Sequence, residues 1–397
     1  MIEVSEAVGT IIENTVSFGT EKIPLNDSLN RILKEDWFTD RPLPPYDRIA
    51  MDGIAINYAT YDKGARQLPV VGMAAAGMQQ QSLADPDACL EAMTGAILPL
   101  GCDTIIPYEH IEIKDGHAHL QQAVTKGQNI HFKGIDRNQG ELVVRTNTQI
   151  SAAEIGVGAS IGKTMATVAR LPKIMVISTG DELVDIDEVP LPHQIRRSNV
   201  YRIVTTLRAY GIQADTDHLT DDRTEIALAL GDYLNTYDVI ILSGGVSKGK
   251  FDFVPEVLTE LSVEKLFHKI KQRPGKPFWF GQHPGGCTVF GFPGNPVSSF
   301  LCYHRYFKTW LEVSLSDKTP VFPRAVLAAD VHFKPDLTYF LEVKISYNEQ
   351  GQILAYPVKG NGSGDLANLS DADAFIELPR GQDVYLAGGV YSIYRYR

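Results

Sequence analysis

Residues 239–252 read VIILSGGVSKGKFD, and this stretch decides the class of fold. The run Val239–Leu242 is short and continuously apolar, which is typical of a strand buried on both faces of a parallel sheet. A glycine-rich turn follows, and counting from Gly244 gives the G-x-x-x-x-G-K pattern of a nucleotide-binding P-loop. The next position is Phe251, so the hydroxyl that would hold Mg²⁺ in a P-loop is missing. The stretch predicts a buried strand and an anion-binding turn, with the carboxylate of Asp252 beside it.

The segments around this turn alternate between strand-like and helix-like patterns. KIMVIS (173–178) is a second short apolar run. SNVYRIVTTLRAYG (198–211) carries apolar residues at helical spacing, behind a Ser198 cap and before Gly211. Further helices are expected in TEIALALGDYL, FVPEVLTEL and SSFLCYHRYFKTWL, the last capped by Ser298 or Ser299. Alternating strands and helices predict a multidomain α/β protein with a central, doubly wound, mostly parallel sheet over residues 171–320.

Other units are expected on both sides of this central domain. The proline-rich segment RPLPPYDR predicts a linker into a new unit, because it suits neither a helix nor a central strand. Residues 41–139 hold short apolar runs and many turn residues, which predicts an inserted β-rich domain. It would interrupt an elongated N-terminal linker domain of residues 1–40 plus 140–170. Residues 321–397 are rich in β-formers without helical periodicity, which predicts a C-terminal all-β domain.

The composition is that of a globular chain with an acidic balance. The 397 residues suffice for two to four domains, and the net charge of −11 argues against general binding to nucleic acid or membrane surfaces. An anionic ligand then needs a locally basic pocket, and KLFHKIKQRPGK (265–276) carries five Lys or Arg and no Asp or Glu. The four cysteines form no C-x-x-C pair, and neither a signal peptide nor an apolar run of about 20 residues is found. A cytoplasmic protein without membrane or nucleic-acid partners is expected.

Three loops are expected at the ligand-binding end of the central sheet. They are STGDEL (178–183), the glycine-rich turn 243–252 and GFPGNPVSS (291–299). Ligands of open parallel sheets bind beyond the carboxyl ends of the strands, where these loops begin. The glycines let an oxyanion approach the backbone amides, and the helix start after the third loop offers further N–H groups.

Two carboxylates at this end point to a divalent cation. Glu182 and Asp252 are suited to hold Mg²⁺ together with phosphate oxygens. Each feature also has a plainer interpretation: Asp252 suits the cap of the following helix, Glu182 a solvated loop, and the segment 293–296 an ordinary turn. A ligand site is favoured because all three loops share one end of the sheet.

Seven stretches occur in the same order as in one known family. They are PPYDRIAMDGIA (44–55), TGAILPLGCDTIIPYE (94–109), STGDELV (178–184), QIRRSN (194–199), SGGVSKGKFD (243–252), PGKPFWFG (274–281) and GFPGNPVSS (291–299). Over essentially its whole length the chain resembles the MoeA-type molybdenum insertases (molybdopterin molybdenumtransferases), which are similar to the gephyrin E domain.

The resemblance implies a transferase of molybdenum cofactor biosynthesis with a molybdopterin-binding fold. Its substrates would be adenylylated molybdopterin and molybdate, its cofactor Mg²⁺, and its products AMP and molybdenum cofactor. Family members are homodimers whose site lies between one subunit's inserted domain and the partner's central domain. The adenylyltransferase that supplies the substrate and the apo-molybdoenzymes that receive the product are further implied partners.

The resemblance also implies roles for named residues. The implied catalytic residues are Asp52, Thr94, Asp136, Glu182 and Asp252, of which Glu182 and Asp252 also bind the metal. Those implied to bind the phosphate are Gly244, Gly245 and Ser247. Those implied to face the pterin phosphate and the molybdate are Lys269, Arg273 and Lys276, with Pro293, Asn295 and Pro296 bordering the molybdate pocket.

The chain departs from the family pattern mainly in the inserted domain. Where the family has N-x-R-x-x-G-E-D, this chain has His131 for the arginine and Ile135 for the glutamate, and Glu91 stands where an arginine is common. Arg273 replaces a frequent lysine, which keeps the charge but changes the donor geometry. Two alternatives therefore stay open. One is a non-catalytic paralogue that acts as a ligand-binding scaffold. The other is a molybdopterin adenylyltransferase, which would need little beyond the central unit.

Overall fold

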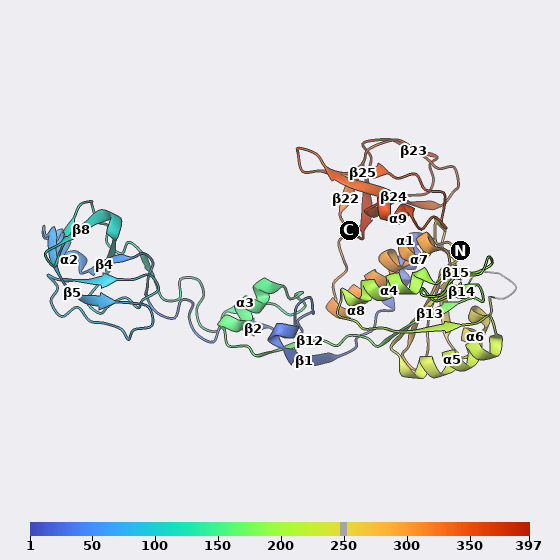
Figure 1. Cartoon of the computed structure of the whole chain (residues 1–397), viewed down its shortest axis with the longest axis horizontal. Coiled ribbons are helices and arrows are strands. Elements are labelled where there is room, and N and C mark those ends of the chain that lie inside the picture. The colour runs from blue at the N-terminus through green and yellow to red at the C-terminus, as the bar shows by residue number, and fades with distance from the viewer. Residues whose placement is uncertain (247–251) are drawn as a thin grey trace.

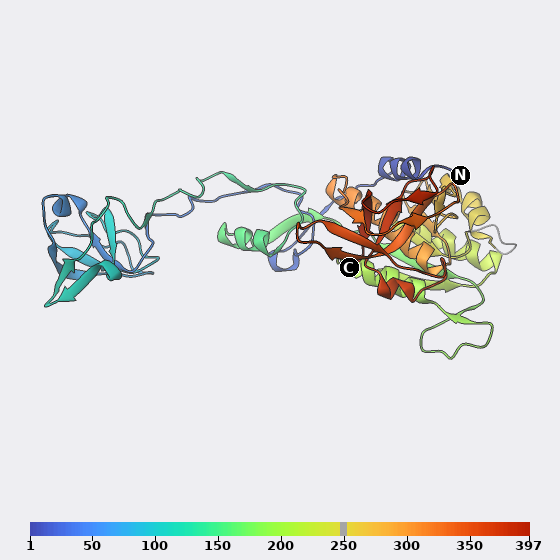
Figure 2. The same cartoon turned by 90° about the horizontal axis from the view of Figure 1, so that it is seen from above.

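The computed structural model describes residues 1–246 and 252–397 and shows an elongated molecule (Figures 1 and 2). An α/β unit and a C-terminal β unit lie at one end, and a small β-rich unit lies at the other. A narrow linker unit connects the two ends. None of the described helices has the length and hydropathy of a membrane span.

The α/β unit is built on a six-stranded sheet in the order β16-β13-β17-β21-β20-β18. Its strands are β13 (Ile174–Thr179), β16 (Asp215–Leu219), β17 (Val239–Ser243), β18 (Glu264–His268), β20 (Trp279–Gln282) and β21 (Thr288–Phe292). The first four strands in that order pair in parallel, and β20 and β18 add an antiparallel edge. β13, β17 and β21 are buried throughout, as their continuous apolar runs predict.

Helices pack on both faces of this sheet (Figure 1). On one face lie α1 (Val4–Glu13), α4 (Ser198–Arg208), α7 (Pro296–Cys302), the π-helical turn η3 (Tyr303–Phe307) and α8 (Lys308–Ser316). On the other lie α5 (Arg223–Thr236) and α6 (Val254–Glu260). The short strands β14 (Leu183–Val184) and β15 (Ile195–Arg196) pair in parallel at the base of a projecting loop.

Helix α1 packs in the core of the α/β unit, although the range 1–40 was assigned to the linker unit. Its buried side chains Val4, Ala7 and Ile11 belong to the hydrophobic cluster that includes Trp310 of α8. An amphipathic pattern predicts a helix with one apolar face, but it does not say which core receives that face.

Two helix starts differ from the prediction. α4 begins at Ser198 with Arg197 at the cap position, because the backbone of Arg197 still pairs with the β14 segment through Val184 O (3.0 Å). α7 has Asn295 at its cap position and proline at its first residue, so Ser298 and Ser299 are buried inside the helix. Proline suits a helix start because its missing N–H has no intrahelical partner there.

The linker unit is made from two segments that are far apart in the sequence. β1 (Thr20–Pro24) pairs with β12 (Met165–Ala169), and β2 (Trp37–Phe38) pairs with β11 (Leu142–Val144). The 3₁₀ turn η1 (Leu25–Asp27) and α3 (Ala152–Ser160) complete it, and α3 starts at a capping box of Ser151 and Glu154. The chain thus runs outward and back through this unit.

The β-rich unit at the far end has a six-stranded sheet in the order β7-β4-β6-β5-β9-β8. Its elements are β3 (Arg48–Ile49), β4 (Gly53–Ile56), α2 (Tyr58–Asp62), β5 (Gln67–Ala74), β6 (Cys89–Ala92), β7 (Thr104–Pro107), η2 (Tyr108–His110), β8 (Ile111–Lys114), β9 (His117–Leu120) and β10 (Ile130–His131). β10 pairs with β3 beside this sheet.

The C-terminal β unit has the strand order β19-β24-β25-β22-β28-β26. Its elements are β19 (Gln272–Arg273), β22 (Arg324–Leu327), β23 (Val331–His332), β24 (Thr338–Tyr347), β25 (Ile353–Pro357), α9 (Asn368–Asp371), β26 (Ala374–Leu378), β27 (Val384–Tyr385) and β28 (Val390–Arg395). Because β19 comes from the basic run 265–276, that run leaves the central sheet and joins this one.

The π-helical turn places a histidine in the core between the α/β and C-terminal units. The ring of His304 is 4.4 Å from that of Phe300 and 5.8 Å from that of Tyr396, between centroids. Burial, reinforced by the charges of Lys308 and Arg202, lowers the pKa of His304 to about 3. This histidine is therefore neutral in the folded protein at neutral and mildly acidic pH.

We expect His304 to make the protein less stable as the pH falls below 6.5. The unfolded chain binds a proton at this histidine near pH 6.5, but the folded chain does so only near pH 3, so acid favours unfolding in between. His304→Phe removes this effect, and the difference in unfolding free energy between variant and wild type should shift by about 1.4 kcal/mol per pH unit in favour of the variant. Urea unfolding of both proteins between about pH 6.5 and 4.5 measures it. A difference that stays constant with pH would contradict the assignment.

Candidate functional site

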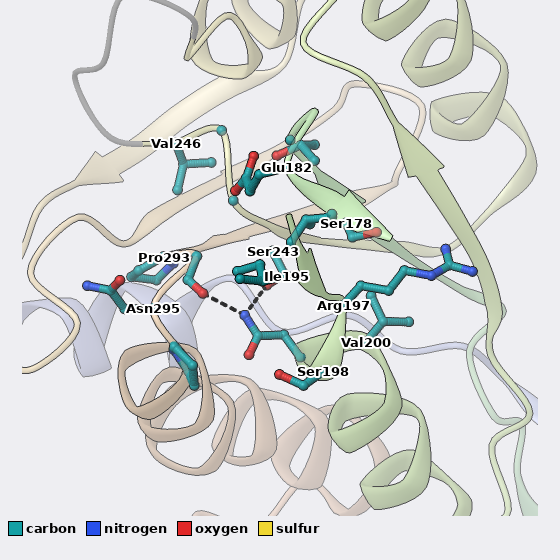
Figure 3. A pocket seen from close by; sticks show the side chains of 18 of the residues that line it. Ser178, Glu182, Ile195, Arg197, Ser198, Val200, Ser243, Val246, Pro293 and Asn295 are labelled. Atoms are coloured by element: carbon teal, nitrogen blue, oxygen red, sulfur yellow. Dashed lines mark hydrogen bonds between the residues drawn. The ribbon is translucent and has the colours of Figure 1, made fainter. Parts of the chain in front are cut away.

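A cavity of about 420 Å³ opens beyond the carboxyl ends of β13, β17 and β21 (Figure 3). All three predicted loops contribute to its walls, namely the segments after β13, β17 and β21. The start of α4 and the residue Asp221 after β16 complete the lining. The crevice therefore lies where ligands bind in open parallel sheets.

The glycine-rich turn passes close to the end of β13. Gly244 and Gly245 have φ of 108° and 66°, a conformation that favours glycine. A Cβ at either position would come within 2.8 Å of Thr179. The turn can approach both the neighbouring strand and a ligand only because these side chains are absent. Ser247 and the rest of the P-loop-like segment up to Phe251 lie outside the described residues.

One side of the cavity is acidic. Glu182, Asp221 and Asp252 line it, and the backbone N–H of Asp221 donates to Asp181 Oδ1 (3.0 Å). Burial raises the pKa of Asp221, and the carboxylates of Asp181, Glu182 and Asp252 add to that rise. The cavity therefore concentrates negative charge where a cation can neutralise it.

Glu182 and Asp252 suit a Mg²⁺ ion that takes its other ligands from water and substrate, rather than a metal ion held by protein ligands alone. Among the described residues, no group of three or more His, Cys, Asp or Glu has the arrangement of a metal site. Mg²⁺ commonly uses one or two carboxylates and takes its other ligands from water and substrate phosphates. Glu182 and Asp252 on one wall fit that mode.

Asp252 lies directly before the start of the following helix. α6 begins at Val254 with Phe253 at its cap, so Asp252 lies one residue outside the helix and lines the cavity. Phe253 itself has helical φ and ψ of −78° and −17°, so Asp252 directly precedes the helical backbone and can serve both as a cap and as part of the cavity wall.

Arg196 and Arg197, which are not among the predicted site residues, also line the cavity, and they come from the segment that pairs with the strand directly after Glu182. Arg197 donates to Asp185 in an ion pair, which together with Tyr201 lowers the pKa of Asp185. Arg196 donates through Nε to Glu188 O (3.0 Å), and its two terminal nitrogens have no hydrogen-bond partner among the described residues. Two adjacent arginines before a helix in an acidic chain were the available signal, and the stretch QIRRSN contains them.

The third loop borders the cavity with Pro293, Asn295 and Pro296. The C-terminal unit holds its outer side: Asn295 Nδ2 donates to Ser363 Oγ (3.0 Å), and Val297 N donates to Ser363 O (3.1 Å). The turn therefore lies between the central and the C-terminal units.

The three basic residues expected at the site do not line this cavity. Lys276 is exposed beside Pro277, which does line it, and Lys269 follows β18 with its N–H bonded to Phe278 O (2.9 Å). Arg273 lines a separate cavity of about 80 Å³ on the other side of the third loop, together with Ser363. The diversion of the basic run into β19 accounts for this placement.

The predicted residues of the inserted unit form a second cluster. Asp52 Oδ1 accepts a hydrogen bond from Thr94 N (2.6 Å), which lowers the pKa of Asp52. Asp136 lies 3.7 Å from His131 Nε2. This unit lies at the opposite end of the elongated molecule from the cavity, so one chain alone does not bring these residues together with Glu182 (Figures 1 and 2).

Comparisons with known proteins agree with this arrangement along the whole chain. Three family models match it: the MoeA N-terminal region (domain I and II) at residues 2–162, a probable molybdopterin binding domain at 175–312, and the MoeA C-terminal region (domain IV) at 324–395. The molybdopterin molybdenumtransferase of Synechocystis sp. is 40% identical over 398 residues, covering 99% of this chain and 100% of the relative. The chain belongs to the molybdopterin molybdenumtransferase family.

More distant members show the same similarity. The Bacillus subtilis molybdopterin molybdenumtransferase is 28% identical over 398 residues, covering 98% of this chain and 92% of its own. The solved structure of the molybdopterin biosynthesis moeA protein from Pyrococcus horikoshii OT3 has a TM-score of 0.84 and 26% identity, with 100% of both chains covered. The family resemblance found in the sequence is thereby confirmed.

The positions at which this molybdopterin molybdenumtransferase family member departs from the pattern have specific surroundings. Glu91 accepts a hydrogen bond from the hydroxyl of Tyr108 (2.7 Å), and burial together with this hydrogen bond raises the pKa of Tyr108. His131 Nδ1 lies 3.1 Å from Nη2 of Arg48. A guanidinium therefore lies beside the position where the family has arginine.

Proposed function

We propose that this protein inserts molybdate into adenylylated molybdopterin and releases molybdenum cofactor and AMP. The observation that supports this most is the single cavity, which joins a glycine turn, paired carboxylates, two arginines and the Pro293–Pro296 turn. A substrate with a phosphoanhydride and a second, oxyanionic substrate need these groups together.

The phosphates would lie against the turn at Gly244 and Gly245, where no side chain blocks them. The N–H of Gly244 already donates to Phe292 O (3.1 Å), so the N–H of Gly245 would be the donor at this turn. Glu182 and Asp252 would hold Mg²⁺, which when bound neutralises phosphate charge and polarises the phosphoanhydride. Arg196, which also lines the cavity, would meet the negative charge of the substrates. Water would add to the adenylyl phosphorus, the P–O bond to the molybdopterin phosphate would break, and AMP would leave. Two Mo–S bonds would form to the dithiolene sulfurs as one oxygen of molybdate leaves as water with the two thiol protons.

The roles of the remaining implied residues are part of this proposal. Lys269, Arg273 and Lys276 would serve the pterin phosphate and molybdate from the far side of the third loop, where Arg273 lines its own small cavity. Ser247 would complete the phosphate turn.

The site is proposed to be shared between two subunits of a homodimer. The Asp52–Thr94 pair and Asp136 lie far from the cavity of their own chain, so they would act at the partner's cavity.

The architecture proposed is the family's doubly wound molybdopterin-binding fold with three accessory domains. The domains would be 1–40 plus 140–170 for the linker, 41–139 for the insertion, 171–320 for the centre and 321–397 for the C-terminal unit. Two segments depart from these bounds: α1 packs with the centre, and β19 joins the C-terminal sheet.

We expect purified protein to release AMP from adenylylated molybdopterin only when molybdate and Mg²⁺ are both present. Nucleotide analysis by chromatography measures the release, and a chelator should abolish it. Tight ligand binding without AMP release would indicate a scaffold. Attachment of AMP to molybdopterin from ATP would indicate an adenylyltransferase. Either result would contradict the proposal.

A further inference from the structure

Helix α4 holds the third loop through two side chains that lie one helical turn apart. Asn199 Nδ2 donates to Ser243 Oγ (2.9 Å) and to Gly294 O (2.7 Å), and Figure 3 draws both hydrogen bonds. Ser243 is the last residue of β17, directly before the glycine turn. Asn199 therefore connects the phosphate turn to the Pro293–Pro296 turn.

The amide of Asn199 has one orientation because its oxygen is also used. A terminal nitrogen of Arg202 donates to Asn199 Oδ1 and to Pro296 O (3.0 Å). With Oδ1 accepting from Arg202, the NH₂ group must point to Ser243 and Gly294, since an amide has its donors on the other side. Two carbonyl groups of the turn, those of Gly294 and Pro296, are thus held by neighbouring side chains of one helix.

Arg202 makes this contact from a partly buried position. Burial lowers the pKa of Arg202 to about 10, so the group is still charged at neutral pH, and its guanidinium lies 5.2 Å from the centre of the Phe300 ring. Its Nε and its other terminal nitrogen have no hydrogen-bond partner among the described residues. Burying a charge with unmet donors costs free energy. We therefore expect the role of Arg202 to be the positioning of the groups that it contacts, Asn199 and the carbonyl of Pro296.

We propose that Asn199, oriented by Arg202, is a positioning residue that sets the distance between the two turns. This inference rests on the proposed function, in which one turn receives the phosphates and the other borders the molybdate. Each ligand can bind to its own turn, but turnover needs both in register. Misplacement of one group by about 1 Å can cost about 100-fold in rate.

The sharpest test is Asn199→Asp, which keeps the size of the side chain and its contact with Arg202. The hydroxyl of Ser243 can turn and donate to the new carboxylate, but Gly294 O is an acceptor only, so the contact with the third loop is lost. We expect molybdate-dependent AMP release to fall about 100-fold, while the Kd for AMP alone, measured by calorimetry, changes by less than about threefold. Thr205→Ala, an exposed change on the same helix, should leave both values as in wild type.

A readout that needs no substrate separates this inference from the proposed function. Hydrogen exchange in the peptide 291–299 should be faster in Asn199→Asp than in wild type and Thr205→Ala. If wild type releases no AMP, the proposed function fails, and the exchange result still decides whether Asn199 holds the loop.

Three results would overturn the inference: AMP release within about threefold of wild type in Asn199→Asp, AMP affinity falling as much as turnover, or unchanged exchange in 291–299. If Asn199→Asp does not fold, Ser243→Ala removes one acceptor and provides the same comparison. We then expect turnover to fall about tenfold with AMP affinity kept, and equal turnover would contradict the inference.

Discussion

Asp252→Asn is expected to lower molybdate-dependent AMP release by at least about 100-fold while the unfolding midpoint stays unchanged. Asparagine has the size of aspartate but lacks the charge that a divalent cation needs. Asp252 lines the cavity, and asparagine caps a helix about as well as aspartate, so the change leaves the fold intact even if Asp252 also caps α6. AMP production and thermal unfolding of the same preparation measure the two effects.

A matched Asp→Asn change is available close by. Asp222 caps α5 by accepting from the N–H groups of Thr224 (2.8 Å) and Glu225 (2.9 Å), and asparagine caps a helix about as well as aspartate. Asp222→Asn should therefore keep full turnover. If Asp252→Asn also keeps full turnover, Asp252 has no catalytic role, and the pairing with Glu182 for Mg²⁺ is refuted.

Mixing two inactive variants, Asp52→Ala and Asp252→Ala, is expected to restore about a quarter of the wild-type activity once subunits have exchanged at equal amounts. In a two-fold dimer with shared sites, one site of each mixed dimer receives intact Asp52 from one chain and intact Asp252 from the other. The expectation rests on the position of the Asp52–Thr94 pair at the far end of the chain from the cavity.

The control for this experiment uses two changes in the same unit. Asp52→Ala mixed with Thr94→Ala should stay inactive, because every inserted unit then carries a defect. Copurification through a tag on one variant shows that exchange has occurred. Exchange without recovery in the first mixture would mean that both residues act within one chain or at different sites.

Much of the central unit follows from local patterns. The apolar runs that form β13, β17 and β21 are too short for helices but long enough for strands, and a turn signal follows each run. Because the carboxyl ends of parallel strands share one edge of the sheet, the loops after these strands were expected to meet there. Glu182, Asp252, Gly244 and the third loop were therefore predictable as neighbours, and the structure brings them to one cavity.

Other parts of the site depend on contacts between distant segments. Asp221, Arg196 and Asn199 line the cavity because β16 and α4 pack beside β13, and the local sequence does not say that they reach it. The basic run 265–276 seemed suited to the same cavity, but β19 pairs with β24 and takes Arg273 to another one. Ser298 was expected to cap the helix, but it lies inside α7, and its hydroxyl accepts a hydrogen bond from Gly275 N (3.2 Å) in the core.

The amino-acid sequence by itself determined the strands, the glycine turn and the end of the sheet where ligands bind, because apolar periodicity and backbone sterics act over a few residues. Only the tertiary structure decided which charged side chains reach that end, and that the Asp52 cluster lies far from the cavity of its own chain. Side-chain direction and strand partners depend on the packing of segments that are far apart in the sequence, and no local pattern contains that information.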